Sequence, residues 1–187
     1  MQTLTLALAT SAVFIFTLPA SAVNPRLIVP GLSMGYIRLG ENVEKATRPL
    51  GPPQDQDGAS GRSWSMWYSR ARNKARTELD VYSVHRDGGR RTVVEQVRVT
   101  SPYFRTAEGV GAASTLAQIQ QAFPLLKDVS LQISESKRSR IIMYDNQARG
   151  IAFEFARKSK TDRQSLHCFA VIIHPRGLSV TSEYLGY

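Results

Sequence analysis

The chain has 187 residues, and its 24 Lys and Arg outnumber its 15 Asp and Glu to give a formal net charge of +9. The single cysteine, Cys168, excludes an intramolecular disulfide. The positive charge favours anionic partners or surfaces, but the sequence shows no recognition helix or stacking motif of the known nucleic-acid-binding types, so no nucleic acid is expected as a partner.

The first 22 residues contain no Asp, Glu, Lys or Arg. The mostly apolar run 4–18 is followed by Pro19 and by Ala20-Ser21-Ala22, a cleavage signature of small residues. A membrane span requires about 20 apolar residues, more than this run offers. The pattern predicts a secretory signal over 1–22 and a protein that is periplasmic or secreted after cleavage near Ala22. An uncleaved anchor stays open, because no side chain before the apolar run is positively charged.

The sequence of residues 23–102 predicts a helix followed by strands. Asn42 is a typical helix-capping residue. Apolar side chains at positions i, i+3 and i+7 then share one helical face: Val43, Ala46 and Leu50. Residues 54–61 are expected to form a polar loop. Three strand-like segments follow, with Asp87-Gly88-Gly89 as the turn before the last: 63–69, 78–85 and 92–100.

Residues 103–187 repeat this order. Ser114 or Thr115 caps a second short helix. Its apolar face has the same spacing: Leu116, Ile119 and Phe123. Asp145-Asn146 is expected to be the turn between the first two strands. Three strand-like segments complete this half: 140–144, 150–156 and 165–173.

A constant shift of 73 residues places Val43 on Leu116 and Val97 on Ala170. We therefore expect an α+β fold of two tandem units, 23–102 and 103–187, each a short helix followed by a three-stranded antiparallel meander. The helices are expected to pack on one face of the sheet, because neither element buries its apolar face alone. Two unrelated α+β segments are the alternative, since this order of elements is common.

The segment Ile28–Gly40, with its glycines at 31, 35 and 40, is followed by Leu50-Gly51-Pro52 and later by Gly109-Val110-Gly111. In these motifs the chain resembles exported bacterial proteins of the β-lactamase-inhibitory type, which share a fold with the small outer-membrane assembly lipoprotein. The resemblance implies tandem helix-plus-sheet units, no enzyme activity, and protein binding through a sheet face or a loop. The chain departs from the lipoprotein in lacking a cysteine after the signal, and from the inhibitors in lacking paired cysteines.

No catalytic, metal or cofactor site is expected. Cys168 lies in an apolar run, which is typical of a buried cysteine; a nucleophilic thiol is the alternative. The three histidines, His85, His167 and His174, show no metal-ligand spacing. A Ser-His-Asp arrangement that assembles across the fold stays open, although no Gly-x-Ser-x-Gly elbow is present.

The candidate binding residues are Trp67, Arg70, Arg72, Lys74 and Arg76. Alternation along a strand places Trp67 on the face opposite Trp64, so Trp67 is either an exposed binding anchor or part of the core. The four basic residues, and a second group at Arg157, Lys158, Lys160 and Arg163, are expected at hairpin tips. They either contact an anionic membrane surface or only keep the protein soluble.

These features together favour an exported, non-catalytic binding module that recognises a protein or an anionic component of the cell envelope. A small secreted or periplasmic hydrolase acting on envelope material is the alternative, and a purely structural envelope protein is a third. A closed pocket with convergent catalytic groups would favour the enzyme. The oligomeric state does not follow from the sequence.

Overall fold

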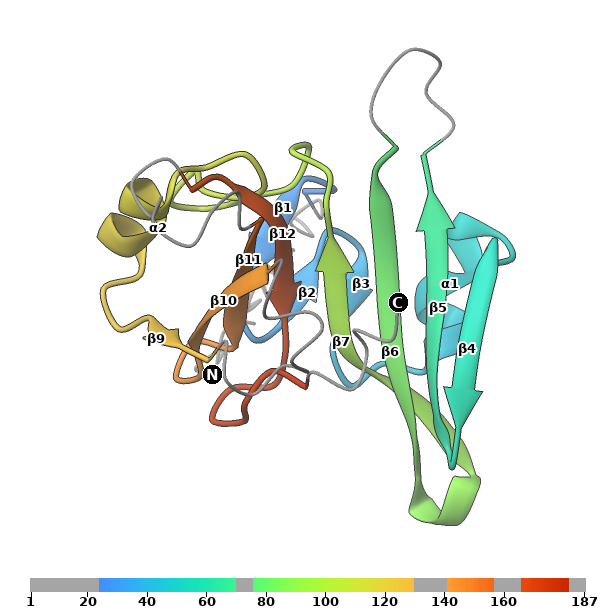
Figure 1. The fold of residues 1–187 in the computed structure, drawn as a ribbon. Coiled ribbons are helices and arrows are strands. Elements are labelled where there is room, and N and C mark those ends of the chain that lie inside the picture. Colours follow the sequence, from blue (N-terminus) through green and yellow to red (C-terminus); the bar gives the residue numbers. More distant parts are fainter. Residues whose placement is uncertain (1–23, 70–75, 130–140, 157–165, 182–187) are drawn as a thin grey trace, which may run out of the picture.

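The computed structural model describes residues 24–69, 76–129, 141–156 and 166–181. The predicted signal, 1–22, lies outside these ranges. Within them the chain is built mainly from β-strands arranged in two sheets, with two short α-helices (Figure 1). None of the described helices is long and apolar enough to span a membrane.

The larger sheet is antiparallel and has eight strands in the order β4-β5-β6-β7-β12-β11-β10-β9. Its first four strands in the sequence are β4 (Asp55–Ala59), β5 (Arg62–Tyr68), β6 (Glu78–Arg86) and β7 (Arg91–Val99). The other four are β9 (Lys127–Asp128), β10 (Ile141–Asn146), β11 (Ile151–Ala156) and β12 (Cys168–Ile173). The two groups meet where β7 pairs with β12, with Val99 opposite Val171. One sheet therefore continues through both halves of the chain.

The smaller sheet has four short strands in the order β3-β2-β1-β8. They are β1 (Leu27–Val29), β2 (Ser33–Met34), β3 (Ile37–Arg38) and β8 (Arg105–Thr106). Gly150, which follows β10, fastens this sheet to the larger one: the Gly31 amide donates to the Gly150 carbonyl oxygen at 3.0 Å. Gly150 has φ 71°, and a side chain there would collide with the His174 carbonyl oxygen and with Gly31, so only glycine fits this approach.

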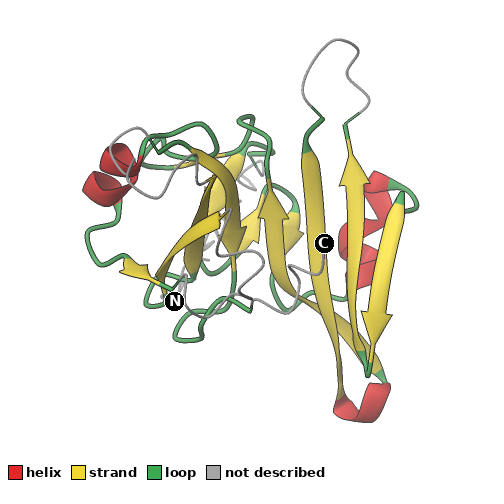
Figure 2. Cartoon of the chain, viewed as in Figure 1, coloured by secondary structure: helices red, strands yellow, loops and turns green. Residues whose placement is uncertain are grey.

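The expected fold class is wrong. The protein is mostly β, with an eight-stranded and a four-stranded sheet and only two short helices, rather than tandem units of one helix and three strands (Figure 2). The predicted polar loop over 54–61 contains β4, whose five side chains are all exposed. β4 is an edge strand that is held by its backbone pairing with β5. Such a strand needs no alternation of apolar and polar side chains, so its polar sequence gave no strand signal.

Both predicted helix starts are confirmed. α1 (Val43–Thr47) begins after Asn42, whose side chain accepts a hydrogen bond from the Lys45 amide. α2 (Leu116–Ala122) begins after Thr115 with a reciprocal capping box to Gln118. Leu50, which the pattern placed on the apolar face of α1, instead ends a 3₁₀ turn and is 40% exposed.

Two hydrophobic clusters cover the two faces of the larger sheet. One face packs against the helices and the smaller sheet, and there Ile119 of α2 and Phe123, the residue that ends this helix, are fully buried. The Phe123 and Phe153 ring centroids lie 5.4 Å apart, and burying one such ring stabilises the fold by about 1.5–3 kcal/mol. The opposite face, here the rear face, carries a second cluster that includes Trp64 and Tyr82.

The two halves of the chain are joined rather than independent. α1 precedes β4–β7 and α2 precedes β9–β12, so each helix precedes four described strands of the larger sheet. However, β8 from the second half pairs in parallel with β1 from the first, and β12 pairs with β7. A division at residue 102 would separate both pairs. Descent from a duplicated unit stays a prediction.

Candidate binding face

The rear face holds a buried group of charges, here the charged cluster: Arg98, Glu78, Asp80 and Glu154. Arg98 on β7 donates from Nε and Nη2 to the Glu154 carboxylate on β11 at 2.9–3.1 Å. Its Nη1 donates to Asp80 at 2.8 Å and to Glu78 at 3.3 Å, both on β6. The side chains of Arg98, Asp80 and Glu154 are 7%, 2% and 0% exposed. The cluster thus ties three strands together.

The sequence of β12 allows Arg98 to reach Glu154. Arg98 lies opposite Ile172, and Glu154 lies opposite Ala170, so the guanidinium passes over β12 beside the short alanine side chain. A β-bulge follows, because Phe155 pairs with Cys168 and leaves Phe169 as an extra residue. The Phe169 ring lies 5.5 Å from the guanidinium carbon of Arg98. The bulge therefore places an aromatic ring next to the charged cluster.

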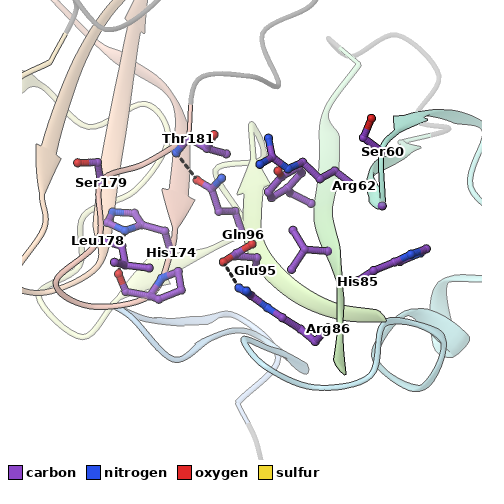
Figure 3. A pocket seen from close by; sticks show the side chains of 14 residues that line it. Ser60, Arg62, His85, Arg86, Glu95, Gln96, His174, Leu178, Ser179 and Thr181 are labelled. Carbon is purple, nitrogen blue, oxygen red and sulfur yellow. Dashed lines mark hydrogen bonds and ion pairs between the residues drawn. The ribbon is translucent and has the colours of Figure 1, made fainter. Parts of the chain in front are cut away.

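A polar hollow of about 420 Å³ opens at the other end of the rear face, between β6, β7 and the segment after β12 (Figure 3). A second bulge borders it: Tyr82 pairs with Gln96 and Ser83 with Val94, so Glu95 is the extra residue of β7. Arg86 donates to Glu95 at 2.6 Å, and Gln96 accepts from the Thr181 amide at 3.1 Å. The lining of the polar hollow therefore includes both a positively charged and a negatively charged hydrogen-bonding side chain.

His174 lines the polar hollow but is fully buried. Its Nε2 lies 3.0 Å from Asp145 Oδ1, and its Nδ1 lies 3.1 Å from the Pro175 carbonyl oxygen. Each ring nitrogen thus lies within hydrogen-bond distance of an oxygen of the fold. Both nitrogens face these two oxygens rather than a serine hydroxyl. Among the described residues, no hydrogen bond links His174 or His85 to the hydroxyls of Ser60, Ser179 or Thr181.

Asp145 lies within β10 rather than in a turn. The prediction of a turn at Asp145-Asn146 is wrong, because β10 continues to Asn146 and the turn follows it. Asp145 is fully buried, and its Oδ2 accepts from the Val180 amide at 3.3 Å. The residue thus fixes the segment after β12 to the sheet, which explains a charged side chain at a buried position.

An apolar hollow of about 600 Å³ lies at the sheet end where β6 and β12 begin and β7 and β11 end. Its wall consists mainly of small or apolar side chains: Thr100, Pro102, Ala112, Ala113, Ala156 and Phe169. Arg76, Glu78, Arg98 and His167 supply the charged or ionisable groups around it. It therefore combines an apolar wall with a charged rim.

Trp67 does not have the exposure that a binding anchor requires. Its side chain belongs to the core on the helix-covered face and is 8% exposed. Its indole Nε1 donates to the Gly51 carbonyl oxygen at 3.1 Å. Trp64 faces the other way, where it stacks on Tyr82 with ring centroids 4.6 Å apart. Both tryptophans are buried because both faces of β5 are covered.

Of the predicted basic residues, the structure describes only Arg76. Its side chain is 63% exposed, its guanidinium carbon lies 4.0 Å from the centre of the Tyr68 ring, and its Nη2 lies 3.5 Å from Glu78. Arg70, Arg72 and Lys74 lie outside the described residues. The second basic group lies outside them as well: Arg157, Lys158, Lys160 and Arg163.

Cys168 is buried, as predicted, with 2% of its surface exposed. Its Sγ donates to the Ala170 carbonyl oxygen at 3.0 Å. Burial raises the pKa of the thiol well above its ordinary value, and the negative charge of Glu154 raises it further. A thiol held in this form is a poor nucleophile. Across the described ranges, no group of three His, Cys, Asp or Glu residues is placed to hold a metal ion.

The charged cluster and both hollows were not predicted from the sequence. Arg98 and Glu154 are 56 positions apart in the sequence, and no local motif connects them. One available signal was the charge within otherwise apolar strands: Arg98 between Val97 and Val99, and Glu154 between Phe153 and Phe155. Comparisons with protein-family models, with curated proteins and with solved structures found no match for this chain.

Proposed function

We propose that the protein is an exported, non-catalytic binding module that recognises an anionic component of the cell envelope. It binds through one end of its larger sheet, here the basic edge. The basic edge comprises Arg76 and the basic residues of the two chain segments that join β5 to β6 and β11 to β12: Arg70, Arg72, Lys74, Arg157, Lys158, Lys160 and Arg163.

The strand register is the observation that carries this proposal. Tyr68 at the end of β5 pairs with Glu78 at the start of β6, and neighbouring Leu79 pairs with Val99. Val99 pairs in turn with Val171 of β12, and the first residue of that strand, Cys168, pairs with Phe155. β5 and β11 therefore end, and β6 and β12 begin, at the same end of the larger sheet.

The composition of the two connecting segments supports binding more than solubility alone. Segment 70–75 carries three basic residues and no acidic one, and segment 157–165 carries four against the single Asp162. Each basic residue close to an anionic membrane contributes roughly 1 kcal/mol to association. Several basic residues that act together thus suffice for an association that salt weakens.

The described residues also support a binding role over the hydrolase. His174 is fully buried, with its ring nitrogens facing Asp145 and the Pro175 carbonyl oxygen, and the Cys168 thiol is buried with a raised pKa. Each of these groups lacks the accessible, activated form that acid–base or nucleophilic catalysis requires. Export is part of the proposal and rests on the sequence of residues 1–22.

The proposal is tested by binding of the exported protein to vesicles in a salt series. Vesicles of a neutral phospholipid are compared with vesicles that contain an added fraction of an anionic phospholipid. We expect binding only to the anionic vesicles, with an affinity that falls steeply as salt increases. Equal binding to both vesicle types, or binding that does not respond to salt, would refute recognition by charge. Exclusive capture of an envelope protein would instead favour the protein-binding role.

A further inference from the structure

We infer that the outer edge of β4, here the β4 edge, binds an extended, basic segment of a partner protein by adding it to the larger sheet as a further strand. β4 pairs with β5 on one side, and all five of its residues are exposed. Figure 1 shows β4 as the outermost strand, with no described strand beyond it. This inference is independent of the proposed function, because it concerns other residues and a ligand of the opposite charge.

The backbone of an edge strand determines the class of ligand. Along a strand, the N–H and C=O groups of alternate residues point outward from the sheet, with the spacing that another strand matches. An extended peptide supplies the matching groups by strand addition. Among the described edge strands β4 is the longest, with five residues, whereas β3, β8 and β9 have two each. The β4 edge is therefore the described edge best able to hold a peptide in one register.

Two carboxylates on β4 favour a basic peptide. Asp55 and Asp57 alternate along the strand, so their side chains share one face. Asp57 pairs with Trp64, whose side chain belongs to the cluster of the rear face, so both carboxylates lie on that face. Burial raises the pKa of Tyr68 above its ordinary value, and the negative charge of Asp55 raises it further. Lys or Arg side chains opposite the two carboxylates would form favourable cross-strand ion pairs.

A small hollow beside β4 provides room for one of these basic side chains. It has a volume of about 300 Å³, and Asp57, Trp64 and Tyr82 are part of its lining. The aliphatic part of a Lys or Arg side chain packs against such an aromatic wall while its charge stays in water. Arg62 lines the same hollow and pairs with Ala59, so the peptide residue opposite Ala59 should be neutral. The β4 edge thus favours two basic residues, two positions apart, followed by neutral ones.

A second copy of this chain is the main alternative occupant. Two β4 strands would each bring two carboxylates and no basic residue to the contact, and like charges opposite each other destabilise a strand pair. The other edge of the same sheet, β9, offers a second copy only two residues, Lys127–Asp128. The charges therefore favour a basic segment of a different protein.

The first test measures the binding of capped peptides by isothermal titration calorimetry. The probe is the Lys peptide, Thr-Lys-Val-Lys-Val-Thr-Thr. One comparator, the Glu peptide, has Glu in place of both Lys residues. The other, the N-methylated peptide, keeps both Lys residues but carries methyl groups on its central backbone nitrogens, so it cannot pair as a strand. We expect the Lys peptide to bind at least about tenfold more tightly than either comparator, because one is repelled and the other loses several hydrogen bonds.

The second test removes the carboxylates. The edge variant combines Asp55→Asn with Asp57→Asn and should bind the Lys peptide about threefold to tenfold more weakly. The matched control combines Asp87→Asn with Asp128→Asn, two exposed acidic residues outside β4, and has the same net charge. It should bind the Lys peptide normally. In the unmodified protein, the bound peptide should slow hydrogen exchange at amides of β4 and leave exchange at β9 unchanged.

Each outcome supports or overturns a stated part of this inference. Absence of binding by the Lys peptide, or equal binding of the N-methylated peptide, would overturn strand addition. Equal binding of the Glu peptide, or equal losses in the edge variant and the control, would overturn recognition by the two carboxylates. Self-association of the protein alone in sedimentation, if the edge variant abolishes it, would identify a second copy as the occupant instead. Peptide binding without vesicle binding would support this inference and refute the proposed function, and the reverse result would do the opposite.

Discussion

Arg98 reaches across β12 to hold Glu154 on β11 with hydrogen bonds from two of its nitrogens, both at 3.1 Å or less. The contact joins the two halves of the larger sheet on its rear face, beside their backbone pairing at β7 and β12. It depends on Ala170, because a larger side chain opposite Glu154 would occupy the path of the guanidinium. The charged cluster is therefore a structural element that also positions the wall of the apolar hollow.

Replacing Arg98 is expected to destabilise the protein strongly. Arg98→Met leaves the buried carboxylates of Glu154 and Asp80 without this guanidinium, and breaking a buried ion pair on one side costs about 3–5 kcal/mol. Arg91→Met, which removes an exposed partner of Asp87, is the control and should change the free energy of unfolding by less than about 1 kcal/mol. Urea denaturation measures both. A similarly small decrease in the free energy of unfolding of both variants would show that the charged cluster contributes little to stability.

The Cys168 thiol is expected to make folding sensitive to alkaline pH. Its pKa in the folded protein is raised above the ordinary 9.0, so above about pH 9 the unfolded chain loses this proton while the folded protein keeps it. Stability is therefore lost as pH rises, by up to about 1.4 kcal/mol per pH unit for one proton.

Cys168→Ala should remove this slope, so the comparison is the stability of the two proteins between pH 8 and pH 10.5. Parallel pH profiles would contradict the raised pKa. The native thiol should also react slowly with a maleimide and rapidly after denaturation, because only 2% of the residue is exposed. Rapid labelling of the folded protein would instead restore the nucleophilic alternative.

Asp145 is expected to hold the segment after β12 in place. Asp145→Asn removes a charged acceptor that serves both His174 and the Val180 amide, and it should cost about 1.5–3 kcal/mol. Hydrogen exchange at the Val180 amide should become faster than in the unmodified protein. The control is Asp57→Asn on the exposed strand β4. Unchanged exchange at Val180 would show that this segment is held by other contacts.

Processing of the signal is a separate prediction. The exported protein should begin at Val23, because Ala20-Ser21-Ala22 is a cleavage signature. Mass spectrometry of the intact exported protein measures its first residue. A mass that retains Met1 would favour the uncleaved anchor over release.

The sequence predicted the local elements better than their assembly. Capping residues and apolar spacing located α1 and α2, and alternation located β5, β6 and β7 within two residues. These local patterns did not predict β4, because an exposed edge strand needs no apolar face. They also did not predict the smaller sheet, whose strands are two or three residues long. Strands this short are defined by their partners rather than by their own sequence.

The candidate site was predicted only in part. The alternation that separated Trp67 from Trp64 was correct, but exposure of Trp67 required one open face, and both faces of β5 are covered. The charged cluster and the apolar hollow depend on pairing between β7, β12 and β11, and on a bulge at Phe169. Contacts over such sequence separations follow from the topology, which local patterns did not contain.

The central claim is that the protein binds an anionic surface through the basic edge. It is tested most directly by removing four positive charges either from this edge or from elsewhere in the chain. One variant changes Arg70, Arg72, Lys74 and Arg76 to Ser; its control changes Arg38, Lys45, Arg48 and Arg90, four exposed residues elsewhere in the chain, to Ser. The two variants have the same net charge. We predict that in co-sedimentation with anionic vesicles at low salt the first variant loses most of its binding and the control retains it. Equal binding by the two variants would contradict recognition through the basic edge.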